Sequence, residues 1–169
     1  MEFQHPIVVL IYSLTVLYPY VIYTWAYTNP VHFLKHCSQK FLIDTSSYSH
    51  FFSFVLYGYI CLQSEFLLES FLFSIPIIII GQVLNFAVYK KLGMCRTYYG
   101  WELGLYNGEL ISGFPFKMGD AQYKGCMLTI LGCFFSFKAT LDVTVATLVW
   151  LIAYTYIIII ENLTPGRKA

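Results

Sequence analysis

Charged residues are scarce in this chain. They make up 11% of its 169 residues, against about 25% in an ordinary soluble domain. The formal net charge is only +1, so the chain has no strong positive field with which to attract phosphates, and we expect no nucleic acid among its partners. Disordered chains are polar and poor in aromatic residues, whereas 58% of the residues here are hydrophobic and 20% are aromatic. The composition therefore excludes a disordered chain and favours a membrane protein.

Cysteine pairs and metal-ligand motifs are missing as well. The five cysteines are an odd number and form no C-x-x-C pair, which argues against both a disulfide framework and a zinc knuckle. The four histidines have no ligand spacing to a cysteine or a carboxylate, so we expect no metal site. Glu2 is acidic and no basic segment precedes the first apolar run, so we expect no cleavable signal peptide.

Long apolar runs fill most of the sequence. The first run is uncharged for 21 residues, which is long enough to span a bilayer. The second and third runs, and likewise the fourth and fifth, are separated by short polar turns and predict two helical hairpins. The sequence thus predicts an all-α polytopic membrane protein, a single domain over residues 1–169, with four to five transmembrane or re-entrant helices. The five runs are residues 7–27, 48–62, 66–89, 123–137 and 141–160.

Two longer polar stretches separate these runs. Residues 28–47 are expected to connect the first two helices as a polar loop. Residues 93–120 are rich in glycine, and a connection of this length is usually functional in a compact protein. We expect the third helix to end near Gly93, because Lys90 and Lys91 suit a helix C-terminus and a glycine follows them.

Helical periodicity singles out two polar faces. Ser70, Ser74, Gly81 and Asn85 share one stripe of the third helix, and such stripes face neighbouring helices because lipid offers no partner for a hydroxyl or an amide. Thr147, Tyr154 and Glu161 recur every seven residues on the last helix. This second face ends in a carboxylate at the edge of the membrane.

The basic residues predict the orientation. With five crossings, nine of the ten lysines and arginines fall on one side, and only Lys138 falls on the other. Such a bias predicts that the basic side faces the cytoplasm or the mitochondrial matrix. The nine are Lys35, Lys40, Lys90, Lys91, Arg96, Lys117, Lys124, Arg167 and Lys168.

Several short motifs follow one another at the basic side. In order, they are Leu92-Gly93, Thr97-Tyr98-Tyr99-Gly100, Phe114-Pro115-Phe116, Tyr123-x-Gly125 and Glu161. Together they resemble the small integral-membrane phospholipid N-methyltransferases, over about residues 27–162. The resemblance implies a role in phospholipid biosynthesis, with S-adenosylmethionine as cofactor and a phosphatidylethanolamine-type lipid as substrate. It also implies an endoplasmic reticulum or mitochondrial membrane.

The resemblance assigns residues to the site. The family's Gly-x-Gly in the third helix reads Ile79-Ile80-Gly81 here, its Asn-Pro-x-Tyr-x-Gly keeps Tyr123 and Gly125, and its Glu-Glu pair is Glu161-Asn162. The amine must be neutral to attack, so a base is needed, and the implied candidates are Glu161 and Asp120. The implied cofactor-binding residues are Gly81, Gly93, Tyr123, Gly125, Glu161 and Asn162. The implied lipid-binding residues are Arg96, Tyr98, Tyr99, Phe114 and Phe116.

The departures from the family pattern leave a second class of function open. Ile79 replaces a glycine, and we expect its side chain to fill room that adenine or ribose would take. The Asn-Pro is lost at Asp120-Ala121, and Glu161 is one carboxylate rather than two. The alternative is a catalytically inactive, methyltransferase-like structural subunit of a larger complex, for example in the mitochondrial inner membrane.

Overall fold

The computed structural model describes residues 2–108 and 111–164, and every regular element among them is helical. Three helices are long and apolar enough to cross a membrane, namely α1, α4 and α6. The prediction of an all-α membrane protein is therefore confirmed. The elements in chain order are α1 (Pro6–Thr28), α2 (Pro30–His36), α3 (Gln39–Leu62), α4 (Leu68–Thr97), the short 3-10 helix η1 (Phe116–Met118), α5 (Ala121–Phe135) and α6 (Leu141–Leu163).

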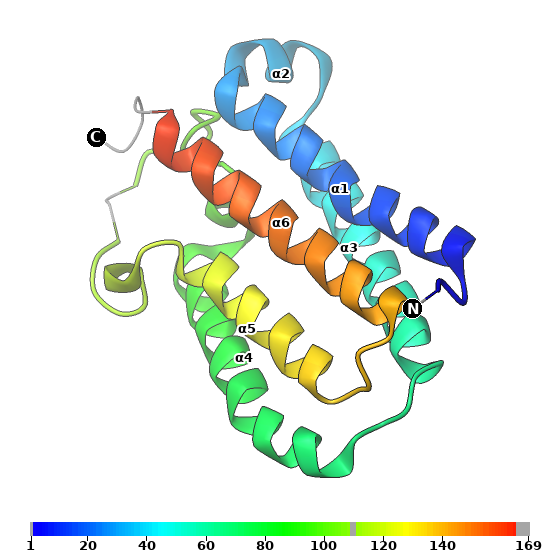
Figure 1. Ribbon diagram of the computed structural model, residues 1–169. Coiled ribbons are helices and arrows are strands. Elements are labelled where there is room, and N and C mark those ends of the chain that lie inside the picture. Colours follow the sequence, from blue (N-terminus) through cyan, green and yellow to red (C-terminus); the bar gives the residue numbers. More distant parts are fainter. Residues whose placement is uncertain (1, 109–110, 165–169) are drawn as a thin grey trace.

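The five long helices run alongside one another as an up-and-down bundle (Figure 1). Helix α6 lies between α1 and α5, while α3 packs on α1 and α4 packs on α5. Helices α3 and α4 make few direct contacts although they follow each other in the chain. The bundle thus consists of two packed pairs, α1 with α3 and α4 with α5, and α6 joins them. The packing is loosest between α3 and α4.

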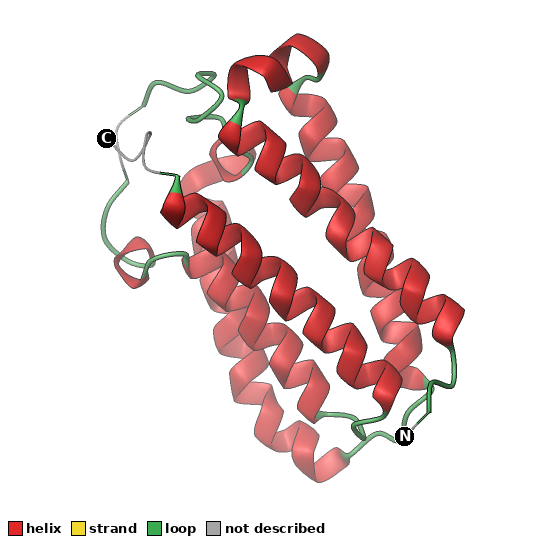
Figure 2. Cartoon of the chain, turned by 45° about the horizontal axis from the view of Figure 1, so that its top comes forward, coloured by secondary structure: helices red, strands yellow, loops and turns green. Residues whose placement is uncertain are grey.

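The two hairpin turns meet at one end of the bundle, where the N-terminus also lies (Figure 2). Phe66 pairs with Phe137 as an isolated bridge, and the Leu67 N–H donates to the Ser136 carbonyl over 2.9 Å. The Lys138 ammonium lies 3.2 Å from the Glu65 carboxylate at the surface. The opposite end collects α2, residues 98–108 and 111–120, and the end of α6, as expected for five crossings. Arg167 and Lys168 lie outside the described residues.

The stretch 28–47 is helical over most of its length, so the predicted polar loop is wrong. Pro30 occupies the first turn of α2, where its fixed φ suits a helix. The Ser38 side chain accepts a hydrogen bond from the Phe41 N–H over 3.1 Å and caps α3. Helix α3 therefore begins at Gln39 and is 24 residues long, which gives it the length to cross that the run 48–62 lacked.

Helix α4 breaks near the predicted place. Gly93 has a φ of +67°, a left-handed conformation that suits glycine, and the chain continues as a further helical turn to Thr97. Its polar stripe faces inward as predicted: Ser74 and Gly81 are buried. A Cβ on Gly81 would lie 2.5 Å from the Gly125 carbonyl oxygen, so these two glycines let α4 and α5 approach closely.

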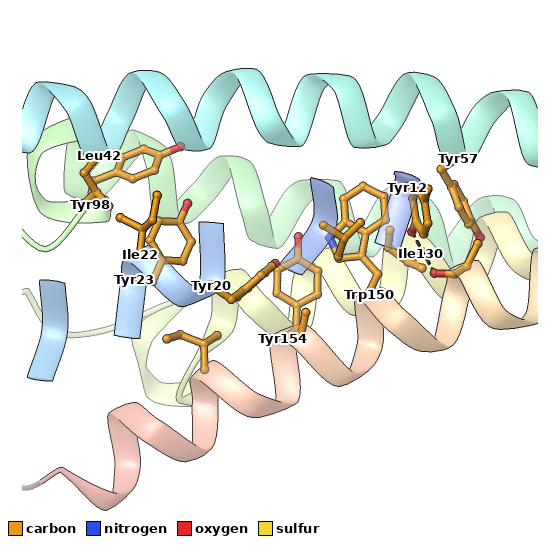
Figure 3. Packing of buried hydrophobic residues seen from close by; sticks show 14 of the residues in the cluster. Tyr12, Tyr20, Ile22, Tyr23, Leu42, Tyr57, Tyr98, Ile130, Trp150 and Tyr154 are labelled. Atoms are coloured by element: carbon orange, nitrogen blue, oxygen red, sulfur yellow. Dashed lines mark hydrogen bonds between the residues drawn. The ribbon is translucent and has the colours of Figure 1, made fainter. Parts of the chain in front are cut away.

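Tyrosine and tryptophan fill the core between the helices (Figure 3). Tyr12 donates to the Ala146 carbonyl over 2.9 Å, and the Tyr57 hydroxyl lies 2.9 Å from that of Thr147. In a membrane such hydroxyls need internal partners, because lipid supplies none. The aromatic residues therefore tie α1 and α3 to α6 through both packing and hydrogen bonds.

Candidate functional site

An inner cavity of about 160 Å³ lies among the five long helices and the turn after α4. It has aromatic walls with three side-chain amides, and none of its described lining residues is Asp, Glu, Lys or Arg. Figure 3 shows Tyr20, Tyr23 and Tyr154 projecting into this part of the core. The lining residues are Tyr20, Tyr23, His50, Phe54, Gln82, Asn85, Tyr89, Thr97, Tyr98, Tyr99, Gln122, Tyr123, Cys126, Thr129, Ile130 and Tyr154.

An outer cavity of about 190 Å³ lies at the polar end of the bundle. Its walls carry three carboxylates, Glu102, Asp120 and Glu161, together with Arg96. Four residues line both cavities: Thr97, Tyr99, Gln122 and Tyr123. The two cavities therefore adjoin each other along these four residues, which form a shared wall. The inner cavity is mainly aromatic, and the outer cavity is acidic.

Glu161 is held at this shared wall by two phenols. Its Oε1 accepts hydrogen bonds from Tyr123 over 2.6 Å and from Tyr99 over 2.7 Å. Its backbone carbonyl accepts a third from Tyr27 over 3.1 Å. Hydrogen bonds to an ionised carboxylate are about twice as strong as those between neutral groups, so the two phenols stabilise a negative charge at this position.

The Tyr99 phenol stays protonated in this arrangement. The side chain is buried, and burial together with the adjacent Glu161 carboxylate raises the pKa of Tyr99 well above its ordinary value. A phenol in this state is a neutral O–H donor. Tyr99 therefore serves to fix the carboxylate rather than to take a proton from a substrate.

The turn after α4 explains why Tyr98 and Tyr99 point to different places. The Thr97 hydroxyl donates to the Gly93 carbonyl over 2.8 Å, and the Gly100 N–H donates to the Cys95 carbonyl over the same distance. Tyr99 has a φ of +58°, an uncommon conformation that is held only where the surroundings require it. Tyr98 therefore lines the inner cavity alone, whereas Tyr99 lines both cavities and reaches Glu161.

The structure brings together only part of the cofactor-binding set implied by the resemblance. Tyr123 and Glu161 meet at the shared wall, and the Asn162 amide lies 3.4 Å from the Asp120 carboxylate. Gly81 and Gly125 face each other between α4 and α5 and line neither cavity. Gly93 stands at the helix break with open space where a side chain would be.

Ile79 does not fill the site. Its side chain is 55% exposed on the outer surface of α4, so the expectation that it occupies room for adenine or ribose is wrong. The reason is helical phase: Gly81 faces α5, and a residue two positions earlier points about 200° away around the helix. A methyl donor would not meet this isoleucine in either cavity.

The implied lipid-binding residues also divide. Tyr98 lines the inner cavity, Tyr99 lines both, and Arg96 and Phe116 line the outer one. The Arg96 guanidinium lies 4.7 Å from the centre of the Tyr106 ring, within cation–π range. Phe114 is 56% exposed at the surface and contributes to neither cavity.

Sequence reasoning missed several lining residues. Tyr20 and Tyr23 line the inner cavity, and Tyr27 donates to the Glu161 carbonyl. These three tyrosines are spaced by three and four residues on α1, which is one face of a helix, and this signal was available in the sequence. His50, on α3, gave no such signal, because a single histidine in an apolar run shows no partner. Among residues 2–108 and 111–164 no group of three His, Cys, Asp or Glu side chains lies close enough to hold a metal ion.

Comparison with known proteins identifies the family. Residues 70–164, which include Tyr99, Tyr123 and Glu161, match the model of the phospholipid methyltransferases. The chain belongs to this family. Membership implies S-adenosylmethionine as methyl donor and a phospholipid as acceptor. Together with the apolar helices, it indicates an integral membrane protein related to methyltransferases.

Three relatives show how far the similarity extends. A phosphatidyl-N-methylethanolamine N-methyltransferase of Arabidopsis thaliana is 34% identical over 130 residues, 73% of this chain and 77% of the relative. Phosphatidylethanolamine N-methyltransferase A of Dictyostelium discoideum is 30% identical over 83 residues, 48% of this chain and 38% of the relative. A phosphatidyl-N-methylethanolamine N-methyltransferase of Saccharomyces cerevisiae is 39% identical over 54 residues, 31% and 26% respectively. No solved structure matches the chain significantly.

Proposed function

We propose that this protein transfers methyl groups from S-adenosylmethionine to the amine of a phosphatidylethanolamine-type lipid. The observation that carries the proposal is the Glu161 carboxylate, which two phenols hold where the two cavities share a wall. A methyl donor and a methyl acceptor must lie in contact and in line for such a transfer. Two adjoining cavities with a fixed negative charge between them suit two cationic reactants.

The outer cavity suits the cofactor. Its donor set includes the carboxylates of Glu161 and Asp120, which complement the cationic sulfonium and the amino group of S-adenosylmethionine. Asn162, beside Asp120, and Tyr123 would complete the set of side chains that hold it. When bound, this cofactor supplies an activated methyl group. Access from the polar end fits a water-soluble donor that arrives from the cytoplasm or the matrix.

Gly81, Gly93 and Gly125 act indirectly in this proposal. The contact between Gly81 and Gly125 brings α5 close to α4, and this spacing sets the position of Tyr123 two residues before Gly125. The break at Gly93 redirects the chain toward the turn that carries Tyr99. Their contribution is to position the phenols that hold Glu161.

The inner cavity suits the lipid amine. Aromatic rings such as Tyr23, Tyr98 and Tyr154 line it, and aromatic faces attract ammonium groups. The Oδ1 of Asn85 is buried there without a hydrogen-bond partner among the described residues, and an ammonium N–H would satisfy it. Since α3 and α4 make few contacts with each other and both line the cavity, lipid would enter between them.

Arg96 and the aromatic residues at the polar end fit the rest of the headgroup. Arg96 lines the outer cavity, and its guanidinium suits the phosphodiester of the lipid. Phe116, in η1, lines the same cavity, while Phe114 is exposed at the polar end of the bundle, and exposed aromatic side chains favour the membrane interface. We propose that these residues set the height of the lipid in the bilayer.

A transfer assay tests the proposal. The purified full chain in phospholipid vesicles is supplied with S-adenosylmethionine carrying a radiolabelled methyl group. Phosphatidylethanolamine and its monomethyl and dimethyl forms are offered separately, and labelled lipid is counted. We expect label in at least one of these lipids. No label above background in any of them would contradict the enzymatic function and favour the non-catalytic subunit.

Glu161→Gln provides the matched test of the site. The amide keeps the size of the side chain but removes its charge, so we expect transfer to fall about 100-fold or more, the range seen when a key electrostatic group is removed. Glu65→Gln is the control, because Glu65 lies exposed at the opposite end of the bundle in a surface ion pair. Equal rates for both variants would show that Glu161 has no special role.

A further inference from the structure

His50 lines the inner cavity from the middle of α3. Its ring stacks on Tyr23, with centroids 6.3 Å apart and an interplanar angle of 26°, and meets Tyr20 edge-on at 6.1 Å. These contacts hold the imidazole among the aromatic rings that we assign to the lipid amine. A histidine in this place requires an explanation. Ionisable side chains are costly within a membrane, and those that occur there usually have a function.

One hydrogen bond fixes which nitrogen of His50 carries the proton. Nδ1 lies 2.8 Å from the backbone carbonyl oxygen of Ser46, one helical turn earlier. A carbonyl oxygen only accepts, so Nδ1 donates, and the neutral ring is left with a lone pair on Nε2. No described residue is hydrogen-bonded to Nε2. The ring is therefore held with its basic nitrogen available to the cavity.

The proposed reaction needs a base at this position. A lipid amine is an ammonium ion near neutral pH, and it has no lone pair until it loses a proton. Of the described residues that line the inner cavity, only His50 has a side chain that is a base in its neutral form; the others are phenols, a thiol, amides, hydroxyls and apolar groups. Glu161 and Asp120 do not line this cavity, and Glu161 already accepts two phenolic hydrogens.

We propose that His50 is the general base that deprotonates the lipid ammonium, an inference that rests on the function proposed above. Nε2 takes one proton from the ammonium nitrogen, and the electron pair of that N–H bond stays on the nitrogen. This pair then forms the new bond to the methyl carbon while the bond from that carbon to the donor's sulfur breaks, and the electrons of the broken bond stay on the sulfur. The imidazolium releases its proton to water before the next turnover. Asp120 and Glu161 remain the negative charges that complement the donor.

The groups around His50 should not complicate the interpretation of its titration. The titratable groups that face it from α1, α4, α5, α6 and the turn after α4 are phenols and one thiol, all neutral near pH 7. No described carboxylate lines the cavity to trap the imidazolium as an ion pair. These groups are Tyr20, Tyr23, Tyr89, Tyr98, Tyr99, Tyr123, Cys126 and Tyr154.

The test measures kcat against pH for the full chain in vesicles, with radiolabelled S-adenosylmethionine and the lipid that the wild type methylates best. For the wild type we expect kcat to rise with pH and reach a plateau as His50 becomes neutral. For His50→Gln we expect kcat to be lower by about 10²–10⁴-fold near neutral pH, the usual contribution of a general base. The kcat of His50→Gln should then rise about tenfold per pH unit, because only the neutral fraction of the lipid amine reacts. The KM for the donor should stay the same.

Two further variants separate a chemical role from a structural one. His50→Ala leaves a space, and imidazole added to the buffer should restore part of kcat if the missing group is a base. His36→Gln is the matched control: it lies exposed on α2, and we expect wild-type kcat and pH dependence. Thermal unfolding in detergent checks that each variant is folded.

The outcomes distinguish the two proposals. A wild type without transfer to any of the three lipids overturns the proposed function and this inference with it. A wild type that transfers methyl groups while His50→Gln keeps its kcat and its plateau overturns the role of His50 alone. A His50→Gln protein that is folded, slow and rises steadily with pH supports it, as does recovery of His50→Ala by imidazole.

Discussion

The Tyr123 hydroxyl lies 2.6 Å from the Oε1 of Glu161 and joins the start of α5 to the end of α6. The two residues are 38 positions apart in the chain, and their contact closes the wall between the inner and outer cavities. Tyr99 approaches the same oxygen from the turn after α4. Three separate segments thus converge on one carboxylate, which makes this contact the centre of the site.

Tyr123→Phe tests the strength of that contact. The change removes one hydrogen bond to a charged group, which contributes about 1.5–3 kcal/mol, and leaves the ring in place. Since about 1.4 kcal/mol is tenfold in an equilibrium constant, we expect kcat/KM for S-adenosylmethionine to fall by roughly 10–100-fold in the transfer assay. Tyr156→Phe, at an exposed tyrosine of α6, is the control and should keep the wild-type value.

Arg96→Gln tests the assignment of the lipid phosphate. If the guanidinium pairs with the phosphodiester, its loss should raise the KM for lipid about tenfold and leave the KM for S-adenosylmethionine unchanged. Initial rates with each substrate varied in turn separate the two constants. A rise in the donor KM instead would assign Arg96 to the carboxylate of the cofactor. Lys138→Gln, at the other end of the bundle, should affect neither constant.

Gly81→Ala tests the close approach of α4 and α5. The new Cβ would lie 2.5 Å from the Gly125 carbonyl oxygen and from the Thr129 hydroxyl oxygen, so the helices must separate. Overpacking of this kind typically costs about 1–3 kcal/mol. We expect a lower midpoint of thermal unfolding in detergent. Gly58→Ala is the matched control, because nothing lies within 4 Å of its Cβ position, and alanine favours a helix by roughly 0.5–1 kcal/mol over glycine. A Gly81→Ala protein as stable as the wild type would contradict the close packing.

Asp142→Asn tests how the N-terminal segment is attached. The buried Asp142 carboxylate accepts the Gln4 N–H over 3.1 Å and the His5 N–H over 2.9 Å, and it lies at the start of α6, where a negative charge suits the helix dipole. The amide removes the charge and one acceptor oxygen. We expect a loss of about 1.5–3 kcal/mol in the free energy of unfolding. Asp44→Asn, at an exposed position of α3, should change it by less than about 0.5 kcal/mol.

Helix content and helix boundaries could largely be predicted from the sequence. Runs such as 7–27 and 141–160 have no plausible structure in a bilayer other than a helix, because every backbone group must be paired internally. Gly93 marked the break in α4, and the face of Thr147, Tyr154 and Glu161 does point inward. Residues 28–47 were misjudged, because polar composition alone does not exclude a capped helix such as the one that begins after Ser38.

The composition of the site was only partly predictable. Tyr123 and Glu161 followed from the family resemblance, whereas His50 and Asn85 acquire their meaning from the cavity they line. Gly81 was expected to contact a ligand, and the structure shows it in contact with Gly125. A glycine can make room either for a cofactor or for another helix. The sequence motif is identical in both cases, so it could not distinguish a cofactor-binding glycine from a helix-packing one.

By itself, the sequence determined that this protein lies in a membrane as a helical bundle and that it resembles a phospholipid methyltransferase, because apolar length and local motifs are properties of consecutive residues. The tertiary structure alone decided that Tyr99 and Tyr123 share one oxygen of Glu161, that Ile79 points outward, and that His50 lines a cavity. Those relationships join residues that are distant in the chain. They depend on how α3, α4, α5 and α6 pack against or apart from each other, and helix packing is set by side-chain shape across the whole bundle rather than by any local pattern.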